Sequence, residues 1–322
     1  MESVSDQTVS RDLMKPLIKT GWGFYVVVTV LVAIVLWGLS VWYYQIQNGM
    51  GVTGLNNPVF WGVYIATFVF YIGISHAGTL ISAILRLTNV EWRRPVTRCA
   101  EAITVFSLMV GAVFPLIHLG RVWKFYWLIP YPNERGLWPN FHSPLVWDFL
   151  AINTYLIGSL TYLYLPLLPD LALVRDSVMG WRKRLYRLLA LGWSGTSLQW
   201  HVLEKAISIM AVIIVPVAVS VHSVVSWDFA MSLNPMWHST IFGPYFVVGA
   251  IFSGIAALIV AMVILRRVFH LEAYLQPVHF SKLGLLLLTM AILWSYFTFA
   301  EYLTTWYGGL PEEMASFRYR VD

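Results

Sequence analysis

The chain has 322 residues, of which 58% are hydrophobic and only 11% charged, and its mean hydropathy is +0.68. A soluble domain carries about a quarter charged residues, so this composition excludes an ordinary soluble protein and favours an integral membrane protein. The single cysteine excludes a disulfide framework, a four-cysteine iron–sulfur site and haem attachment through paired cysteines. We assign the net charge of +5 to basic loops at one membrane face rather than to nucleic-acid binding.

Seven apolar stretches are long enough to cross a bilayer, which takes about 20 apolar residues. The predicted fold class is therefore all-α, a polytopic transmembrane helix bundle. We expect a cytoplasmic segment at 1–20, a transmembrane domain at 21–306 and a polar outer-side tail at 307–322. The predicted spans are Gly21–Ile46, Pro58–Leu85, Cys99–Leu119, Pro144–Leu168, Leu198–Val221, Thr240–Leu265 and Leu283–Trp306.

The basic residues predict the orientation of these spans. With the N-terminus inside, fifteen of the 21 Lys and Arg residues fall on the inner side and five on the outer side, and Lys205 lies within a span. Such an excess predicts a cytoplasmic N-terminus. The long outer connection at 121–141 is rich in Trp, Tyr and Phe. Its composition suits either a surface for a partner protein or a loop lying on lipid headgroups.

One pattern, H-S-x-x-x-W-D-F, occurs twice, at residues 142–149 and 222–229, and both copies fall at the predicted outer face. Oxidation of a quinol releases two electrons and two protons, and a histidine and a carboxylate are suitable proton acceptors. We therefore predict that His142 and Asp148 of the first copy are catalytic, with Trp147 as a wall for the quinol ring.

Three further residues are predicted to bind the quinol. His118 and Arg121 lie three residues apart, and hence on one face, at the outer end of the third span. The alternative for both is that they only reach toward the lipid headgroups, and Asp148 could then simply pair with Arg121. His76 lies deep in the second span among small residues, where it is either a quinol ligand or a packing histidine.

Ionisable side chains inside spans are costly, so each needs a partner, a cavity or a role. We predict a proton pathway through Glu101, His222, Asp228 and Glu301. For His222 and Asp228 the alternative is that they hold a loop rather than bind substrate. A b-type haem needs two histidines that face each other at similar depth. Only His76 is expected to lie deep, which disfavours haem.

Several short motifs resemble a known family. The stretches SHAGT (75–79), EWRRP (91–95) and FPLIHLGR (114–121) resemble the NrfD/polysulfide reductase membrane-subunit family, and WPNFHSPLVWD (138–148) is similar to the ActC subunit of bacterial alternative complex III. The resemblance implies an NrfD-like four-helix bundle with flanking helices. ActC-like chains are expected to have ten spans in two bundles. Seven spans leave the second bundle incomplete, which a truncation after Asp322 would explain.

The resemblance also implies a function. It predicts a quinol-binding membrane subunit of a respiratory or photosynthetic complex, which oxidises quinol, such as menaquinol, near the periplasmic face and contains no haem or metal of its own. The implied partners are a periplasmic iron–sulfur subunit, a multihaem cytochrome c, other membrane subunits and the lipid bilayer, with no nucleic acid. Such a chain is inactive alone. The alternatives are a proton-translocating or transport subunit, a haem-b membrane anchor and a scaffold without substrate.

Overall fold

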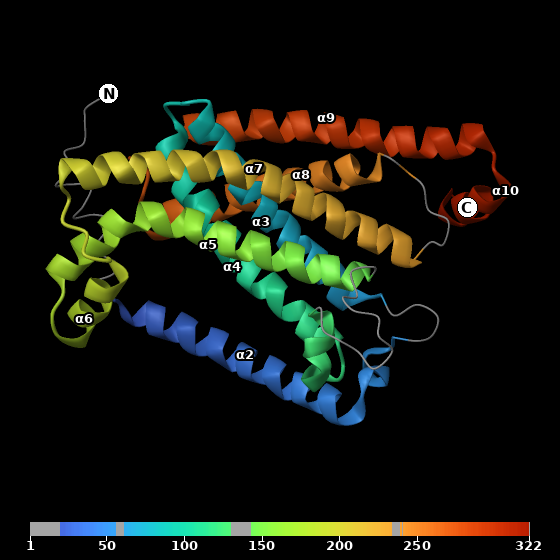
Figure 1. Cartoon of the computed structure of the whole chain (residues 1–322), viewed down its shortest axis with the longest axis horizontal. Helices are drawn as coiled ribbons and strands as arrows, with labels where there is room; N and C mark the ends of the chain where they lie inside the picture. Colours follow the sequence, from blue (N-terminus) through green and yellow to red (C-terminus); the bar gives the residue numbers. More distant parts are fainter. Residues whose placement is uncertain (1–19, 56–60, 130–142, 234–238, 240, 322) are drawn as a thin grey trace. The chain divides into compact units, whose positions relative to one another are not determined.

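The structure is a computed structural model that describes residues 20–55, 61–129, 143–233, 239 and 241–321. These residues form helices joined by turns, and no strand occurs among them. The α-helices are α2 (Trp22–Asn48), α3 (Val63–Leu87), α4 (Arg93–His118), α5 (Pro144–Ser177), α6 (Gly180–Leu189), α7 (Ser197–Leu233), α8 (Phe242–Val268), α9 (Pro277–Gly308) and α10 (Pro311–Val321), with short 3-10 helices η1 (Met50–Thr53) and η2 (Val122–Leu128) (Figure 1).

Seven of the helices, α2, α3, α4, α5, α7, α8 and α9, are long and apolar enough to cross a membrane. The predicted count of seven spans and the all-α class are therefore confirmed. Several helices run past the predicted apolar stretches. Helix α4 begins at Arg93 rather than Cys99, because its first turns carry arginines whose long side chains can reach polar surroundings. Helix α7 continues to Leu233 and so includes the whole second H-S-x-x-x-W-D-F copy.

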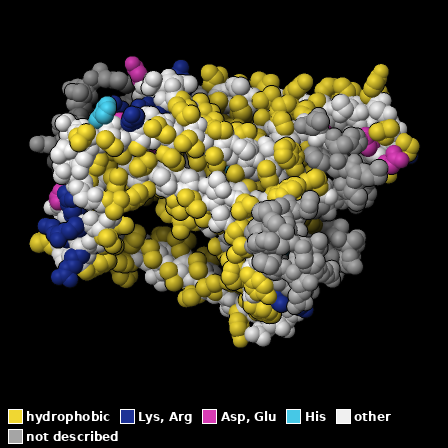
Figure 2. Space-filling model, viewed as in Figure 1, with side chains coloured by type: hydrophobic (Ala, Val, Ile, Leu, Met, Phe, Trp, Pro, Cys, Tyr) yellow, Lys and Arg dark blue, Asp and Glu magenta, His cyan; other side chains and the backbone are white. Residues whose placement is uncertain are grey.

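The described chain divides into two compact units, each of which we describe by itself. The first unit comprises residues 1–60, 119–122 and 163–207 and contains α2 and α6. Helix α2 exposes apolar side chains on all sides, as expected for a helix in lipid. Helix α6 is short and carries four basic residues beside exposed Trp181 and Leu188. Figure 2 shows Lys and Arg gathered over this helix, which has the composition of a helix at a membrane surface.

The second unit comprises residues 61–118, 123–162 and 208–322 and is built around α3. This helix lies between α4 and α8, and α9 lies along α8 (Figure 1). Glycines permit the close approach of these helices. A Cβ atom added at Gly78 would collide with α4 at Thr104, and one added at Gly254 would collide with α3 at Ala77. Small residues at such contacts let two helix backbones approach closely, which strengthens packing within a bilayer.

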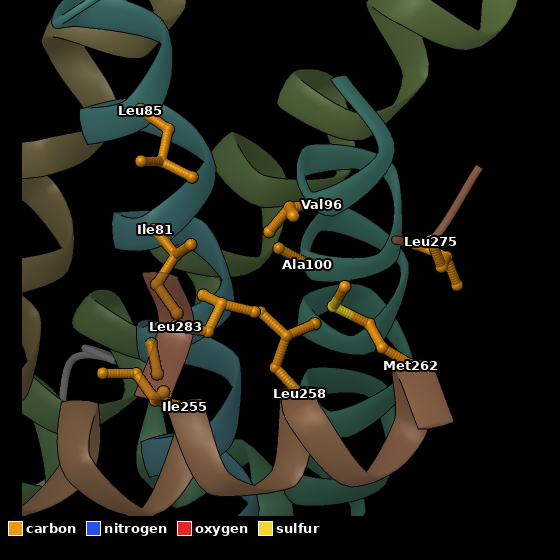
Figure 3. Close-up of a cluster of buried hydrophobic side chains, with 10 residues drawn as sticks. Ile81, Leu85, Val96, Ala100, Ile255, Leu258, Met262, Leu275 and Leu283 are labelled. Atoms are coloured by element: carbon orange, nitrogen blue, oxygen red, sulfur yellow. The ribbon is translucent and has the colours of Figure 1, made fainter. Parts of the chain in front are cut away.

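One cluster of buried apolar side chains forms a core in this second unit. Its side chains come from α3, α4, α8, α9 and the turn before α9, and they gather between these helices (Figure 3). Leu258, Met262 and Leu283 are fully buried, although most other apolar side chains of α9 are exposed. The cluster fixes α3, α4 and α8 relative to one another, and it thereby positions the polar side chains described below. Its members are Ala77, Ile81, Leu85, Val96, Ala100, Ile255, Leu258, Met262, Leu275 and Leu283.

Candidate functional site

Two buried histidines lie in contact at the centre of the second unit. His76 of α3 and His222 of α7 are only 1% and 2% exposed, and their ring centroids are 4.6 Å apart. His222 thus lies beside His76 and is equally buried, so the prediction that only His76 lies deep is wrong. Residue 222 falls within α7 because that helix continues beyond the apolar run used to predict its end.

A hydrogen bond determines which ring nitrogen of His76 carries the proton when the ring is neutral. Its Nδ1 atom donates to the backbone carbonyl oxygen of Ile72 at 2.7 Å. A neutral ring therefore keeps its proton on Nδ1 and leaves Nε2 as an acceptor. Nε2 is buried and has no hydrogen-bond partner among the described residues. One face of the ring stacks on Tyr155 of α5, with centroids 4.0 Å apart and planes 9° apart.

His222 is held by aromatic contact rather than by hydrogen bonds. Its ring centroid lies 4.8 Å from that of Phe246 of α8. Within the described part of the chain neither ring nitrogen makes a hydrogen bond of ordinary geometry, although the backbone of Phe246 comes near the ring. A buried imidazole without good partners costs free energy, so this position has an unused capacity to bind a polar group.

A set of hydroxyl groups continues from His76 along α3. The Tyr155 hydroxyl bonds to Thr79 at 2.7 Å and accepts a bond from Ser75 at 3.3 Å. Thr79 in turn donates to Thr104 of α4 at 3.4 Å. These side chains are all buried. Because hydroxyl groups both donate and accept, the set can pass a proton between neighbours if their bonds reorient.

A second polar cluster lies one helical turn further along the same three helices. Ser82 donates to a carboxylate oxygen of Glu101 at 2.7 Å and bonds to the Tyr162 hydroxyl at 3.3 Å. The other oxygen of Glu101 lies 3.9 Å from a guanidinium nitrogen of Arg98. Glu101 is therefore not an isolated charge. It is a buried carboxylate with a hydroxyl and a cation beside it, as ionisable groups within a membrane require.

The two copies of H-S-x-x-x-W-D-F place their aspartates near each other. The carboxyl groups of Asp148 on α5 and Asp228 on α7 lie close enough to interact electrostatically. Two carboxyl groups at such range disfavour a state in which both are ionised, so the pair can hold a single proton. Asp228 lies in a helix rather than in a loop. The first copy's histidine, His142, lies outside the described residues.

The remaining predicted site residues have the following surroundings. His118, at the end of α4, has Trp61 as its aromatic neighbour, with ring centroids 6.5 Å apart. Arg121 is exposed and belongs to the first unit. Trp147 is 38% exposed. Glu301 of α9 accepts a hydrogen bond from Ser239 at 3.0 Å. The joint action of these residues at one quinol site stays a prediction.

Sequence reasoning missed the tyrosines Tyr155 and Tyr162, although a signal for them exists. Together with Asp148 they recur every seven residues, which places all three on one face of α5. Likewise Ser75, Thr79 and Ser82 share one face of α3, while most other residues of these helices are apolar. A polar residue that repeats at helical spacing within an apolar span therefore indicates a buried polar face.

Helices of this length and apolarity, with buried histidine, tyrosine and carboxyl groups, define a polytopic membrane protein with a polar interior. More particularly, the chain belongs to the NrfD family: the family described as "Polysulphide reductase, NrfD" matches residues 51–312. The resemblance to the NrfD/polysulfide reductase membrane-subunit family is thereby confirmed, whereas the similarity to the ActC subunit stays a prediction.

Curated relatives agree with this membership. The chain is 28% identical to a putative dimethyl sulfoxide reductase membrane subunit of Halobacterium salinarum over 81% of its own length and 56% of that protein. It is 27% identical to a selenate reductase subunit of Mesobacillus selenatarsenatis over 72% and 54%. It is 23% identical to an Hdr-like menaquinol oxidoreductase integral membrane subunit of Archaeoglobus fulgidus over 86% and 60%. The chain thus spans little more than half the length of these relatives.

Proposed function

We propose that this chain is the quinol-binding membrane subunit of an electron-transfer complex similar to alternative complex III. The proximity of Asp148 and Asp228 carries this proposal, because it brings together two copies of one motif at a pair of carboxyl groups, of which Asp228 is buried and Asp148 partly buried. Family membership supports it, as does the similarity to a relative named as a menaquinol oxidoreductase subunit. The proposed setting is a bacterial inner membrane with the N-terminus in the cytoplasm.

The proposed reaction converts a quinol to a quinone with the release of two protons and two electrons. The aspartate pair, which holds one proton and one negative charge, accepts the first proton. His142 accepts the second. Trp147, His118 and Arg121 hold the ring near the periplasmic end of the bundle. The electrons leave to a periplasmic iron–sulfur subunit and pass on to a multihaem cytochrome c, so the chain alone has no turnover.

Substitution of Asp148 by asparagine in the assembled complex tests this role. The amide cannot accept the proton, so quinol oxidation should fall by about a hundredfold or more. Asp170→Asn is the matched control, because Asp170 lies on the same helix and is exposed. The Asp170→Asn complex should oxidise quinol at the wild-type rate. Both variants should assemble as the wild type does. Normal turnover in Asp148→Asn would refute the assignment.

A second candidate function, proton translocation, is favoured by the buried polar groups on α3, α4 and α5. They extend from the His76–Tyr155 stack past Thr79 to the Ser82–Glu101 cluster, near the arginine-rich start of α4. This end of the bundle is the predicted cytoplasmic one. The arrangement supplies donors and acceptors along residues 75–82, about a third of the length of α3, as a proton path needs.

Proteoliposomes distinguish the two functions. With the whole complex in vesicles, addition of quinol and an electron acceptor should change the internal pH if protons cross the membrane. Glu101→Gln should abolish the pH change and leave quinol oxidation intact when an uncoupler is present. If the wild-type complex oxidises quinol without moving protons, the second function is refuted and the first stands.

A further inference from the structure

A pocket of about 270 Å³ lies between α3, α8 and α9, with His222 of α7 at one wall. Neither Asp148 nor Asp228 lines it. Apart from His222, the pocket is lined by aromatic side chains and by small residues. The residues that matter for the argument are Phe70, Gly73, Tyr245, Gly249 and Trp294, together with His222.

Glycine creates the space in this pocket. A Cβ atom at Gly249 would lie 3.2 Å from the indole nitrogen of Trp294, so a larger residue would displace the indole. Trp294 stacks on Tyr245 with ring centroids 5.9 Å apart and planes at 30°. Flat aromatic walls around a narrow space suit a planar ring better than a flexible chain.

The pocket opens on the apolar surface of the helices. Phe70 and Trp294, which line it, are 53% and 38% exposed, and both belong to helices that are long enough to cross a membrane. Acyl chains cover such a surface in a bilayer. A ligand therefore enters from the lipid, and it must be soluble there.

The ligand must also carry a hydrogen-bonding group. His222 is only 2% exposed, lines the pocket, and has ring nitrogens without well-formed hydrogen bonds within the described ranges. A plain acyl chain would leave the imidazole unsatisfied, whereas a ring oxygen would bond to it. The imidazole can bind either a quinone or a quinol, because one ring nitrogen donates to a quinone carbonyl and the other accepts from a quinol hydroxyl.

We propose that this pocket binds the ring of an isoprenoid quinone, with a ring oxygen hydrogen-bonded to His222, as a second site apart from the Asp148–Asp228 pair. The choice of a quinone among lipid-soluble rings rests on the proposed function. The location, the lateral entrance and the contact with His222 rest on the pocket itself.

Photolabelling of the protein in lipid nanodiscs tests the proposal. The probe is a photoreactive azido-naphthoquinone with an isoprenoid tail, and labelled peptides are mapped by mass spectrometry. The wild type should be labelled within residues 245–253 of α8 and 69–73 of α3. His222→Phe keeps a flat aromatic ring at this position and removes both nitrogens, so labelling should fall about tenfold. His201→Phe, an exposed position on the same helix, should be labelled like the wild type.

A second variant and a second probe keep the test decisive. Val69→Trp fills the pocket from α3 and leaves His222 itself unreplaced. It should reduce labelling to the same degree as His222→Phe. Unchanged labelling in both variants, or labelling confined to other segments, would overturn the proposal. Equal labelling by a photoreactive phospholipid, independent of His222, would also overturn it and identify an acyl-chain groove.

The two proposals fail in different ways. Asp148→Asn should lower quinol oxidation without changing the labelling of the pocket. If that variant oxidises quinol normally while His222→Phe loses the label, the proposed reaction site is refuted and the pocket assignment stands. If Asp148→Asn is inactive while His222→Phe is labelled normally, the pocket assignment is refuted and the proposed reaction site stands.

Discussion

Replacement of Gly254 by alanine should force α8 away from α3. The added Cβ atom would collide with the Cβ of Ala77 and lie 3.3 Å from both the Cα and the carbonyl oxygen of Ile74. Two of these three neighbours are backbone atoms and the third is a methyl group, so no flexible side chain can move aside. The helices themselves must separate, and the apolar cluster of Figure 3 opens with them.

The size of the effect follows from these contacts. Overpacking a well-packed interior costs about 1–3 kcal/mol, and the rigid neighbours of Gly254 place the cost at the upper end. Alanine returns up to about 1 kcal/mol, because it loses less conformational freedom than glycine in a helix. We expect the free energy of unfolding to fall by about 2 kcal/mol, which is roughly a thirtyfold change in the folding equilibrium constant.

Reversible unfolding in mixed micelles, followed by circular dichroism during a titration with denaturing detergent, measures this change. Gly284→Ala is the control, because a Cβ atom at Gly284 of α9 meets nothing within 4 Å. The control should be as stable as the wild type or slightly more so. If Gly254→Ala unfolds at the same detergent concentration as Gly284→Ala, then the close α3–α8 packing does not limit stability and the reasoning is refuted.

Two further predictions concern the polar interior. Asp228→Asn should lower quinol oxidation as Asp148→Asn does. The double variant should lose little more activity than either single variant, because both changes affect one shared proton. Additive losses in kcat would argue against a shared proton. Tyr155→Phe should reduce the free energy of unfolding by about 1 kcal/mol, because the hydroxyl bonded to Thr79 is lost while the ring stays. The same detergent titration measures this loss, with exposed Tyr296→Phe as the control, and equal stability of the two variants would contradict a buried hydroxyl bond.

The membrane fold could be predicted from the sequence because hydropathy is a local property. Each span is an apolar run long enough to cross a bilayer, and a helix in lipid satisfies its backbone within its own segment. No knowledge of distant residues is needed, so the count of seven is confirmed. The ends of the helices were predicted less well. Polar residues continue a helix without adding to its apolar run, as at the first turn of α4 from Arg93 and between His222 and Asp228 of α7.

The candidate site could be predicted only in part. The repeated H-S-x-x-x-W-D-F motif identified Asp148 and Asp228 as important, yet nothing in the motif shows that the two carboxyl groups lie near each other. Tyr155 was not predicted, because the seven-residue spacing of Asp148, Tyr155 and Tyr162 was not recognised as one polar face of a helix. The structure shows what this face meets, since Tyr155 stacks on His76 of α3.

The sequence by itself determined that this is a helical membrane protein of the NrfD family with ionisable residues in its spans. The tertiary structure alone decided which of those residues meet. The contact of His76 with His222, and the pocket beside it, depend on the rotation of each helix about its axis and on where glycines let two backbones approach. These are properties of pairs of helices, so no single apolar stretch contains them.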